Sequence, residues 1–358
     1  MNPHPRALRA SPRAQWLTLL WVLAALPVLM ALPARGATES PASGYAKRAD
    51  VNAFIAALAT NDGFDATTLR QLFAQVRAQP SVVAAMSRPL VAPPTWFDYA
   101  PRFLSPARID AGIAFWQANA VALARAENEF GVPAEVIVAI IGVETFYGRN
   151  TGSYRVIDAL TTLAFDYPRR AEFFASELRH FLLLTREQGV SPLLPRGSFA
   201  GAIGLPQFMP GSIRAYALDY GGDGRVDLAT DPVDAIGSVA NYLARHGWQS
   251  GQPVMEVVRV EGERRDAMLG TLDGGMAERR PLSEWVNGGV TGFAIPGDLA
   301  ADPVGLLMLE QRDALTYWVV FNNWYVLTRY NRSRLYASAV WQLALALKEA
   351  RAQAIPAR

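Results

Sequence analysis

The most constraining feature of the sequence is a segment, residues 133–148, that is apolar on almost every face and carries one acid near its end, Glu144. Pro133 suits the first turn of a helix, and Glu135 suits the positive end of the helix dipole. Since nearly every residue at its centre is apolar, the segment predicts a helix that is buried on all sides. A carboxylate there is costly unless it is paired or protonated. Glu144 is therefore either a general acid whose pKa is raised by burial or a core residue paired with an arginine.

The N-terminus has the pattern of a targeting signal. Three arginines precede an uncharged apolar run over residues 16–32, and small residues stand at plausible cleavage positions before residue 37. This pattern predicts a signal peptide over residues 1–36, with an uncleaved membrane anchor as the alternative. Removing it takes away four arginines and no acid, which changes the net charge from +2 to −2. The basic balance therefore does not indicate a nucleic-acid-binding surface.

The chain contains no cysteine, which excludes disulfides, thiol nucleophiles, thiolate metal sites and a lipid anchor on cysteine. Outside the signal segment the histidines are His180 and His246, which are far apart in sequence. This spacing argues against a zinc site or a Ser-His-Asp triad. We expect carboxylates, hydroxyls and amides to carry the chemistry, with no cofactor for catalysis.

Periodicity and turn residues predict a mainly α-helical chain with a small β-rich insertion. Residues 37–47 are small and polar and predict a flexible linker. The predicted helical stretches are 50–90, 105–130, 133–146, 169–187, 231–247 and 340–350, with a helix start at Asp65 and an extended connection over 91–106. The best predicted strands are a run from Pro253, residues 306–310 and residues 317–321.

The turn after the buried helix combines Glu144 with glycines, Phe146 and Tyr147. Glycines let a ligand approach the backbone closely, and aromatic faces suit the apolar faces of sugar rings. Either aromatic could equally be a core residue.

Two further segments have compositions suited to sugar binding. The loop over residues 197–212 combines small residues with Ser198 and Gln207, which can hydrogen-bond a polar ligand without adding charge. A phosphate-binding loop is disfavoured because no GK[ST] motif follows. Near the C-terminus, Tyr330 and Asn331 pair an aromatic ring with an amide.

Residues 219–234 resemble a calcium-binding loop, with acids at loop positions one, five and nine and glycine at six. Gly221 at position three has no side chain, and no Glu stands at position twelve. The alternative is a solvated acidic turn in which Asp231 caps the next helix. The candidate ligands are Asp219, Asp223, Arg225, Asp227 and Asp234.

Taken together, these segments resemble the lytic murein transglycosylase B family of bacterial cell-wall enzymes, from about Tyr99 to Leu343. The motifs that carry the resemblance are Gly-Val-Glu144-Thr-Phe-Tyr-Gly, Gly-Ser198-Phe-Ala-Gly-Ala-Ile-Gly followed by Pro-Gln207-Phe-Met-Pro, Asp231-Pro-Val-Asp-Ala-Ile-Gly-Ser-Val-Ala-Asn-Tyr242, and Thr-Arg-Tyr330-Asn331. The resemblance implies a mainly α fold, with a lysozyme-like helical core, an additional helical domain and a small inserted β domain. It also implies a structural calcium site at the Asp219 loop.

On this resemblance we expect four regions after the linker. They are a helical domain at 48–130 joined by the C-terminal helix at about 333–352, a catalytic core at 131–252, a β-rich domain at 253–320, and a return to the core at 321–358. Lacking cysteine, the chain resembles the soluble periplasmic version and not the lipoproteins. We expect a monomer whose partners are peptidoglycan strands and other cell-wall enzymes, with no nucleic acid.

The implied activity is cleavage of the β-1,4 bond between N-acetylmuramic acid and N-acetylglucosamine, with a 1,6-anhydro product and Glu144 as the sole acid and base. The residues expected to position the sugar are Ser198, Gln207, Tyr242, Tyr330, Asn331, Tyr147 and, at the cleft rim, Tyr99. One alternative is a lysozyme-type hydrolase that uses water and a second carboxylate, for which Asp158 and Asp166 are candidates. The other is a non-enzymatic wall-binding protein in which Glu144 is a paired core residue.

Overall fold

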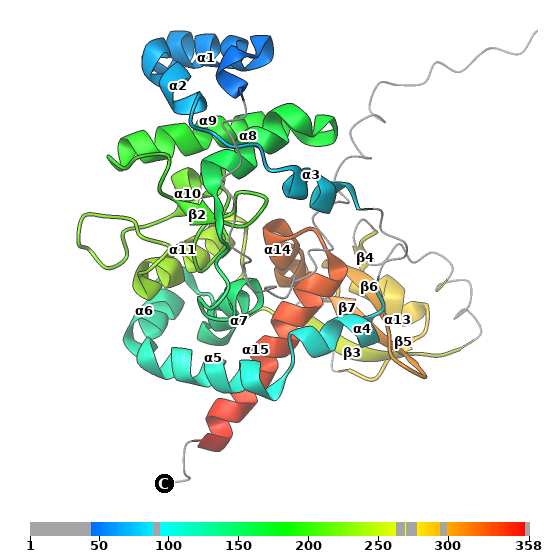
Figure 1. The fold of residues 1–358 in the computed structure, drawn as a ribbon. Coiled ribbons are helices and arrows are strands. Elements are labelled where there is room, and N and C mark those ends of the chain that lie inside the picture. Colours follow the sequence, from blue (N-terminus) through cyan, green and yellow to red (C-terminus); the bar gives the residue numbers. More distant parts are fainter. Residues whose placement is uncertain (1–43, 89–93, 263–268, 270–277, 294–298, 355–358) are drawn as a thin grey trace, which may run out of the picture.

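The computed structural model describes residues 44–88, 94–262, 269, 278–293 and 299–354. Helices dominate it, and a small sheet lies to one side (Figure 1). This confirms the predicted mainly α class with a small β region. The predicted signal segment and most of the predicted linker lie outside the described residues. No helix in the described part combines the length and hydrophobicity needed to cross a membrane.

The N-terminal helices pack against the long helices that follow α7 in the chain, which are α8 and α9 (Figure 1). Asp65 starts the second of them as predicted, since its carboxylate accepts the Thr68 N–H at 2.7 Å. The end of the predicted linker is ordered instead, because Tyr45 is buried in a short 3-10 helix, Tyr45–Lys47. The helices of this layer are α1 (Ala49–Asp62), α2 (Ala66–Phe73), α3 (Pro80–Ser87), α8 (Val156–Asp166) and α9 (Ala171–Glu187).

The segment expected to be an extended connection contains a short helix, α4 (Trp96–Tyr99). Thr95 explains this difference, because its side chain accepts the Asp98 N–H and caps the helix start. The extended connection predicted from proline and aromatic content is therefore wrong for this segment, where local hydrogen bonding supports a helical turn.

The predicted single helix over 105–130 is two helices, α5 (Pro106–Ala118) and α6 (Ala120–Phe130). They meet at Asn119, whose backbone leaves the helical region and whose side-chain amide donates to the Phe115 carbonyl at 2.9 Å. Gly131 then ends α6 in the left-handed conformation, as predicted.

Helix α7 (Ala134–Thr145) lies in the main hydrophobic core. It packs against α5, α6, α11 (Pro232–Arg245) and α15 (Arg334–Ala354) (Figure 1). Every residue from Ala134 to Val143 is buried, as the sequence predicts. Packing therefore holds the helix in place on all sides, and Glu144 lies at its C-terminal end.

Two short strands, β1 (Tyr154–Arg155) and β2 (Arg196–Gly197), tie the chain after α7 to the loop that precedes α10 (Pro210–Tyr216). The approach is closest at Gly152, which has a φ of 95°. A Cβ atom there would lie 2.1 Å from the Gly197 carbonyl oxygen. Only glycine lets the two segments meet here.

The inserted sheet is antiparallel, with strand order β4-β6-β7-β3-β5. A hydrophobic cluster separate from the main core packs between it and α13 (Leu282–Asn287), whose Trp285 indole donates to the Val304 carbonyl. The predicted strands at 306–310 and 317–321 fall within or next to β6 and β7. The strands are β3 (Met255–Val260), β4 (Arg280–Pro281), β5 (Val290–Thr291), β6 (Pro303–Glu310) and β7 (Leu315–Val320).

Helix α14 (Asn322–Tyr330) leads from the sheet back to the core, and α15 follows it. In Figure 1 α14 lies beside α15, between the sheet and the remaining helices. Its first turn lies next to β7, and its last turn reaches the end of α7 through contacts given below.

Candidate active site

Three segments that are distant in sequence meet at the end of α7. The Thr145 hydroxyl donates to the Leu205 carbonyl at 2.9 Å, which fixes the loop over residues 197–209 against α7. The Tyr330 hydroxyl at the end of α14 donates to the Pro206 carbonyl at 2.7 Å, on the same loop. The segments that the sequence singled out for sugar binding therefore come together around Glu144.

The Glu144 carboxyl is held by a neighbour that sequence reasoning missed. Its Oε1 accepts a hydrogen bond of 2.6 Å from the hydroxyl of Tyr336, on the first turn of α15. Within the described part of the chain no arginine forms an ion pair with Glu144. This contradicts the alternative in which Glu144 is a core residue paired with an arginine. The only sequence signal for Tyr336 is its position shortly after the Tyr330-Asn331 motif.

The pKa of Glu144 is raised to about 7 by burial, which outweighs the opposite effect of the Tyr336 hydrogen bond on the charged form. The residue nevertheless keeps part of its surface exposed. A carboxyl group that is both reachable and protonated below about pH 7 has the properties that a general acid requires.

Buried tyrosines surround this carboxyl. The Tyr330 and Tyr336 rings are stacked, with centroids 6.3 Å apart and planes 15° apart. Burial raises the pKa of Tyr99, Tyr330 and Tyr336, and the nearby charge of Glu144 raises each further. These hydroxyls therefore stay protonated and contribute hydrogen-bond donors without adding charge.

Asn331 follows Tyr330 at the end of α14 and has a free acceptor. Its side-chain Oδ1 is buried and has no hydrogen-bond partner in the described structure. A buried unsatisfied carbonyl is costly, and such a group in a native structure calls for an explanation. An N–H group of a ligand would satisfy it.

Ser198 and Gln207 shape the loop that faces these residues. The Ser198 hydroxyl oxygen accepts the Ala202 N–H at 3.0 Å, which leaves its own O–H free to donate. The Gln207 amide donates to Gly204 and Thr151 carbonyls at 2.8 and 3.1 Å. Gln207 is thereby clamped between its own loop and the chain that follows α7.

Backbone strain is concentrated at this site. In the described ranges the non-glycine residues with left-handed backbone are Phe146, Tyr147 and Gln207, with φ of 52°, 58° and 51°. Such conformations cost about 1–3 kcal/mol each and persist where surrounding contacts impose them. Two of the three directly follow α7, so the turn after Glu144 is held in a shape that the chain would not adopt alone.

Tyr147 and Tyr242 contact the elements that carry the site. The Tyr147 ring packs between α5 and α7, where a Cβ at Gly142 would lie 2.5 Å from its hydroxyl. The Tyr242 hydroxyl donates to the Arg329 carbonyl at 2.7 Å, and its ring stacks on His246. In this structure both support the segments that carry the site.

Arg108 is a second residue that sequence reasoning missed. Its buried guanidinium donates to the Gly142 carbonyl, near the end of α7, and lies 4.5 Å from the centroid of the Phe146 ring. A cation at this end of a helix is favourable for the helix dipole. No pattern in the sequence marks it.

The acids proposed as a second catalytic carboxylate are engaged elsewhere. Asp158 forms an ion pair of 2.7 Å with Arg155 and accepts the Arg77 N–H. Asp166 pairs with Arg48 and accepts the Tyr45 hydroxyl. Both bind the N-terminal helices to α8, so neither is a partner for Glu144.

The acidic loop binds its own backbone. Asp219 accepts the N–H groups of three following residues, and the buried Asp234 accepts those of Tyr220, Gly221 and Asp227. Asp231 caps α11 through the Val233 N–H. In the described ranges no group of three or more His, Asp or Glu residues is placed to hold a metal ion.

Calcium takes six to eight oxygen ligands, so a site here would need backbone carbonyls and water as well as these carboxylates. A carboxylate has about four lone-pair positions, so Asp219 keeps some acceptor capacity beyond its backbone contacts. Asp223, Asp227 and the Arg225 carbonyl remain the other candidates. Calcium binding here stays a prediction, and no catalytic step depends on it.

The sequence matches the family model described as Transglycosylase SLT domain over residues 46–345. It is 41% identical to "Membrane-bound lytic murein transglycosylase B" of Escherichia coli strain K12 over 86% of this chain and 85% of that protein.

Solved structures of related enzymes have the same fold. Soluble lytic transglycosylase SltB1 from Pseudomonas aeruginosa is 48% identical, with a TM-score of 0.80, over 85% of this chain and 99% of that chain. Escherichia coli lytic transglycosylase Slt35 in complex with calcium is 39% identical, with a TM-score of 0.78, over 90% and 100%. SltB3 from Pseudomonas aeruginosa in complex with NAG-anhNAM-pentapeptide is 33% identical, with a TM-score of 0.73, over 84% and 79%. These likenesses confirm the predicted lysozyme-like fold class and the predicted family.

Proposed function

The chain belongs to the Transglycosylase SLT domain family and is an enzyme of the lytic transglycosylase type, and we propose that it cleaves peptidoglycan by a non-hydrolytic route with Glu144 as the only acid and base. The proposed bond is the β-1,4 link from N-acetylmuramic acid to N-acetylglucosamine. The proposed product carries a 1,6-anhydromuramic end. Because the SltB3 relative binds a disaccharide with a pentapeptide, we propose that the substrate carries peptide stems on its muramyl sugars.

In the first step the Glu144 carboxylic acid donates its proton to the glycosidic oxygen, and the bond from that oxygen to the muramyl C1 breaks. The pKa of about 7 supports this role, because the acid is protonated below neutral pH and still able to release its proton. The N-acetyl carbonyl oxygen of the muramyl sugar bonds to C1 and stabilises the developing positive charge.

In the second step the ionised Glu144 takes the proton from the muramyl C6 hydroxyl. The C6 oxygen bonds to C1 and displaces the N-acetyl oxygen, which closes the anhydro ring. Glu144 regains its proton and no water is consumed. The internal attack is favoured because nucleophile and carbon belong to the same sugar.

The single observation that carries this proposal is that, among the described residues, Glu144 is the carboxyl at the meeting point of the three segments and no other acid acts on its pKa. Ordinary glycosidases use a pair of carboxylates. Here the sequence-predicted second acids are bound in ion pairs on α8, and the groups around Glu144 are neutral tyrosines. Neutral donors suit a route in which the substrate supplies its own nucleophile.

Side chains around Glu144 support a positioning role. The free Oδ1 of Asn331 is suited to accept the N–H of the substrate's N-acetyl group. The Ser198 hydroxyl is available to a sugar oxygen, while Gln207 and Tyr330 hold the loop in place. Tyr99 adds an aromatic ring close enough to feel the charge of Glu144, and Tyr147 and Tyr242 hold the helices that carry the site.

We further propose that the chain acts outside the cytoplasmic membrane, where peptidoglycan lies. The arginine-flanked apolar run at residues 16–32 supports export. Since no cysteine is present, a lipid anchor on cysteine is excluded.

The test is mass spectrometry of the products that the purified protein releases from peptidoglycan in ¹⁸O-labelled water. We expect muropeptides one water lighter than hydrolysis products and free of the label. Labelled reducing ends would show a hydrolase and would overturn the proposed route. Unchanged peptidoglycan, with Glu144→Gln still binding it, would favour a wall-binding protein.

A further inference from the structure

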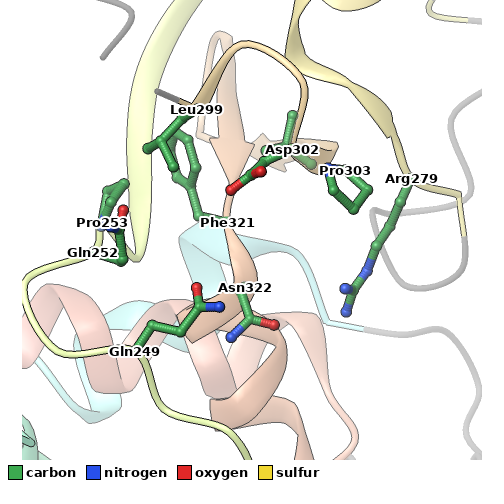
Figure 2. A pocket seen from close by; sticks show the side chains of 10 residues that line it. Gln249, Gln252, Pro253, Arg279, Leu299, Asp302, Pro303, Phe321 and Asn322 are labelled. Atoms are coloured by element: carbon green, nitrogen blue, oxygen red, sulfur yellow. The ribbon is translucent and has the colours of Figure 1, made fainter. Parts of the chain in front are cut away.

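A buried cation from α5, Arg108, contacts the turn that follows Glu144. The pocket in Figure 2, where the inserted sheet meets the core, shares no lining residue with this region. Arg108 is only 9% exposed, and its Nε has no hydrogen-bond partner in the described structure. Burial lowers the pKa of Arg108, and among the described residues no acid forms an ion pair with it. A buried charge without a counter-charge is costly, so its position calls for another reason.

Arg108 strengthens the last turn of α7. Its guanidinium donates a hydrogen bond to the Gly142 carbonyl, which also accepts the Phe146 N–H at 3.0 Å. The bond from Phe146 to Gly142 spans the turn that contains Glu144. A cation is favourable there, because the negative end of the helix dipole lies at the C-terminus. Arg108 therefore stabilises this turn from outside the helix.

Arg108 also contacts the side chain of the strained residue that ends α7. Phe146 has the left-handed φ and ψ of 52° and 51°, at a position where glycine is the usual residue. The Arg108 guanidinium lies 4.5 Å from the centroid of the Phe146 ring, within range of a cation–π contact. The exposed Arg149 lies equally close to this ring, so the added bond to Gly142 is what distinguishes Arg108. It contacts both ends of a turn that surrounding contacts must hold in place.

The same guanidinium reaches the segment that carries Tyr99. It donates to the Arg102 carbonyl at 3.1 Å and lies 5.4 Å from the centroid of the Phe103 ring. The Phe103 and Tyr99 rings are in contact, with centroids 4.9 Å apart. Tyr99 in turn lies close enough to Glu144 to feel its charge. Arg108 thus joins the turn after Glu144 to the Tyr99 segment.

These contacts act on the position of Glu144 and not on its charge. Burial and the Tyr336 hydrogen bond set the pKa of Glu144, and Arg108 is not among the groups that shift it. A misplacement of about 1 Å at a catalytic group can cost about 10²-fold in rate. A residue that fixes the turn after Glu144 can therefore control the rate without tuning the acid.

We propose that Arg108 is a positioning residue for Glu144, which holds the last turn of α7 against the Tyr99 segment so that the carboxyl meets the glycosidic oxygen. The inference rests on the proposed function, because it requires Glu144 to be the acid. It does not depend on whether the attacking group is the muramyl C6 hydroxyl or water.

The experiment compares kcat and KM of Arg108→Met and Arg108→Lys with those of the unaltered protein on purified peptidoglycan. Methionine keeps an unbranched side chain and removes the charge and the donors. Arg108→Met should lower kcat by about 10²-fold and leave KM within about two-fold. Lysine keeps the charge but not the planar donor fork, so Arg108→Lys should lose about ten-fold in kcat. The alkaline limb of the kcat profile should stay at the same pH in both variants.

Arg125→Met is the matched control. Arg125 on α6 also donates to a backbone carbonyl and lies over an aromatic ring, both of Tyr220 on the acidic loop. This variant should lower the melting temperature and keep kcat. If it loses as much kcat as Arg108→Met, the loss reflects general destabilisation and the assignment of Arg108 is wrong.

A double variant tests the proposed contact with the turn. Glycine takes the left-handed conformation freely, so Phe146→Gly removes the strain that Arg108 is proposed to hold. In that background Arg108→Met should cost about ten-fold in kcat instead of about 10²-fold. Equal losses in both backgrounds would overturn the assignment.

Three other results would also overturn it: full kcat in Arg108→Met, a loss carried by KM, or a shifted alkaline limb. If circular dichroism shows that Arg108→Met does not fold, Arg108→Lys tests the same split between kcat and KM. Glu144→Gln is measured alongside. Normal cleavage by Glu144→Gln would overturn the proposed function, whereas an inactive Glu144→Gln with full kcat in Arg108→Met would overturn only the role of Arg108.

Discussion

The end of α7 and the acidic loop over residues 219–234 use the same functional group in opposite ways. In the described part of the chain Glu144 is a carboxyl among buried and partly buried tyrosines that accepts one hydrogen bond, and burial raises its pKa to about 7. The loop carries several carboxylates, which accept many backbone N–H groups. There, hydrogen bonds from Thr230 and neighbouring amides hold the pKa of Asp227 below its usual value despite partial burial.

The difference shows that environment decides what a carboxyl group does. Desolvation without enough donors favours the neutral form, which can give up a proton during a reaction. A surplus of N–H donors favours the charged form, which then fixes a loop. A count of acids in the sequence would rank the loop first for chemistry, although its carboxylates are already committed to structure.

The largest expected effect is that of Glu144→Gln, which removes the proton and keeps the shape. Cleavage should fall by about 10³-fold or more, since in the proposed mechanism the acid step and the base step both depend on this group. Release of soluble muropeptides measures it. Glu127→Gln, at an exposed glutamate on α6, is the matched control and should keep full activity.

The same variant tests the raised pKa of Glu144 through the pH dependence of the free energy of unfolding. A raised pKa means that the folded state binds the proton more tightly, so the stability linked to it is present below about pH 4.5 and is lost as pH rises through about 7. At pH 8 the free energy of unfolding of Glu144→Gln, measured with denaturant, should exceed that of the unaltered protein by about 1–3 kcal/mol. This difference in the free energy of unfolding should narrow at pH 5. A Gln variant that is less stable at both pH values would contradict the assigned environment.

On the other side of the comparison, Asp234→Ala should destabilise the fold by about 3 kcal/mol. It leaves three backbone N–H groups near a buried position without their acceptor. Urea unfolding in the presence of a chelator measures this, with Asp223→Ala as the exposed control. If Asp234→Ala instead shifted the pH dependence of cleavage and left stability alone, the division of roles between the two regions would be wrong.

A smaller effect is expected for Tyr336→Phe. Its hydrogen bond favours the charged form of Glu144, so its loss should raise the pKa of Glu144 further and move the alkaline limb of kcat/KM to higher pH. We expect a rate reduction of about ten-fold, because the ionised acid formed during the reaction loses its donor. A pH profile identical to that of the unaltered protein would show that the contact does not tune the acid.

The smallest effect concerns calcium. The loop lacks a side chain at Gly221, and its acids already bind backbone N–H groups, so we expect millimolar calcium to raise the melting temperature by only about 2–4 °C over chelator. Differential scanning calorimetry measures it, and Asp219→Asn should remove the rise. No shift at all would exclude a structural calcium site here.

Much of this arrangement follows from local sequence. The apolar run fixes α7 and places Glu144 at its end, and Gly131, Asp65 and Asp231 end or cap helices as their residue types predict. Composition also points to the segments around Ser198, Gln207 and Tyr330; in the structure Tyr330 donates to the Pro206 carbonyl of the Ser198–Gln207 loop, and Gln207 donates to the Thr151 carbonyl after α7.

What could not be predicted depends on contacts between distant segments. Tyr336 is one of many tyrosines, and only the packing of α15 against α7 brings it to Glu144. Arg108 lies on a helix of ordinary composition and meets the end of α7 in the folded state only. The engagement of Asp158 and Asp166 likewise depends on where the N-terminal helices pack.

The most direct test of the account is the titration of Glu144 itself. Infrared difference spectra between the unaltered protein and Glu144→Gln isolate the carboxyl stretch of this one residue as pH is varied. The account predicts a protonated carboxyl band at pH 6 that disappears with a midpoint near pH 7. A band already absent at pH 6, with a midpoint near 4.5, would show an ordinary solvated carboxylate and would contradict the assignment of Glu144 as the general acid.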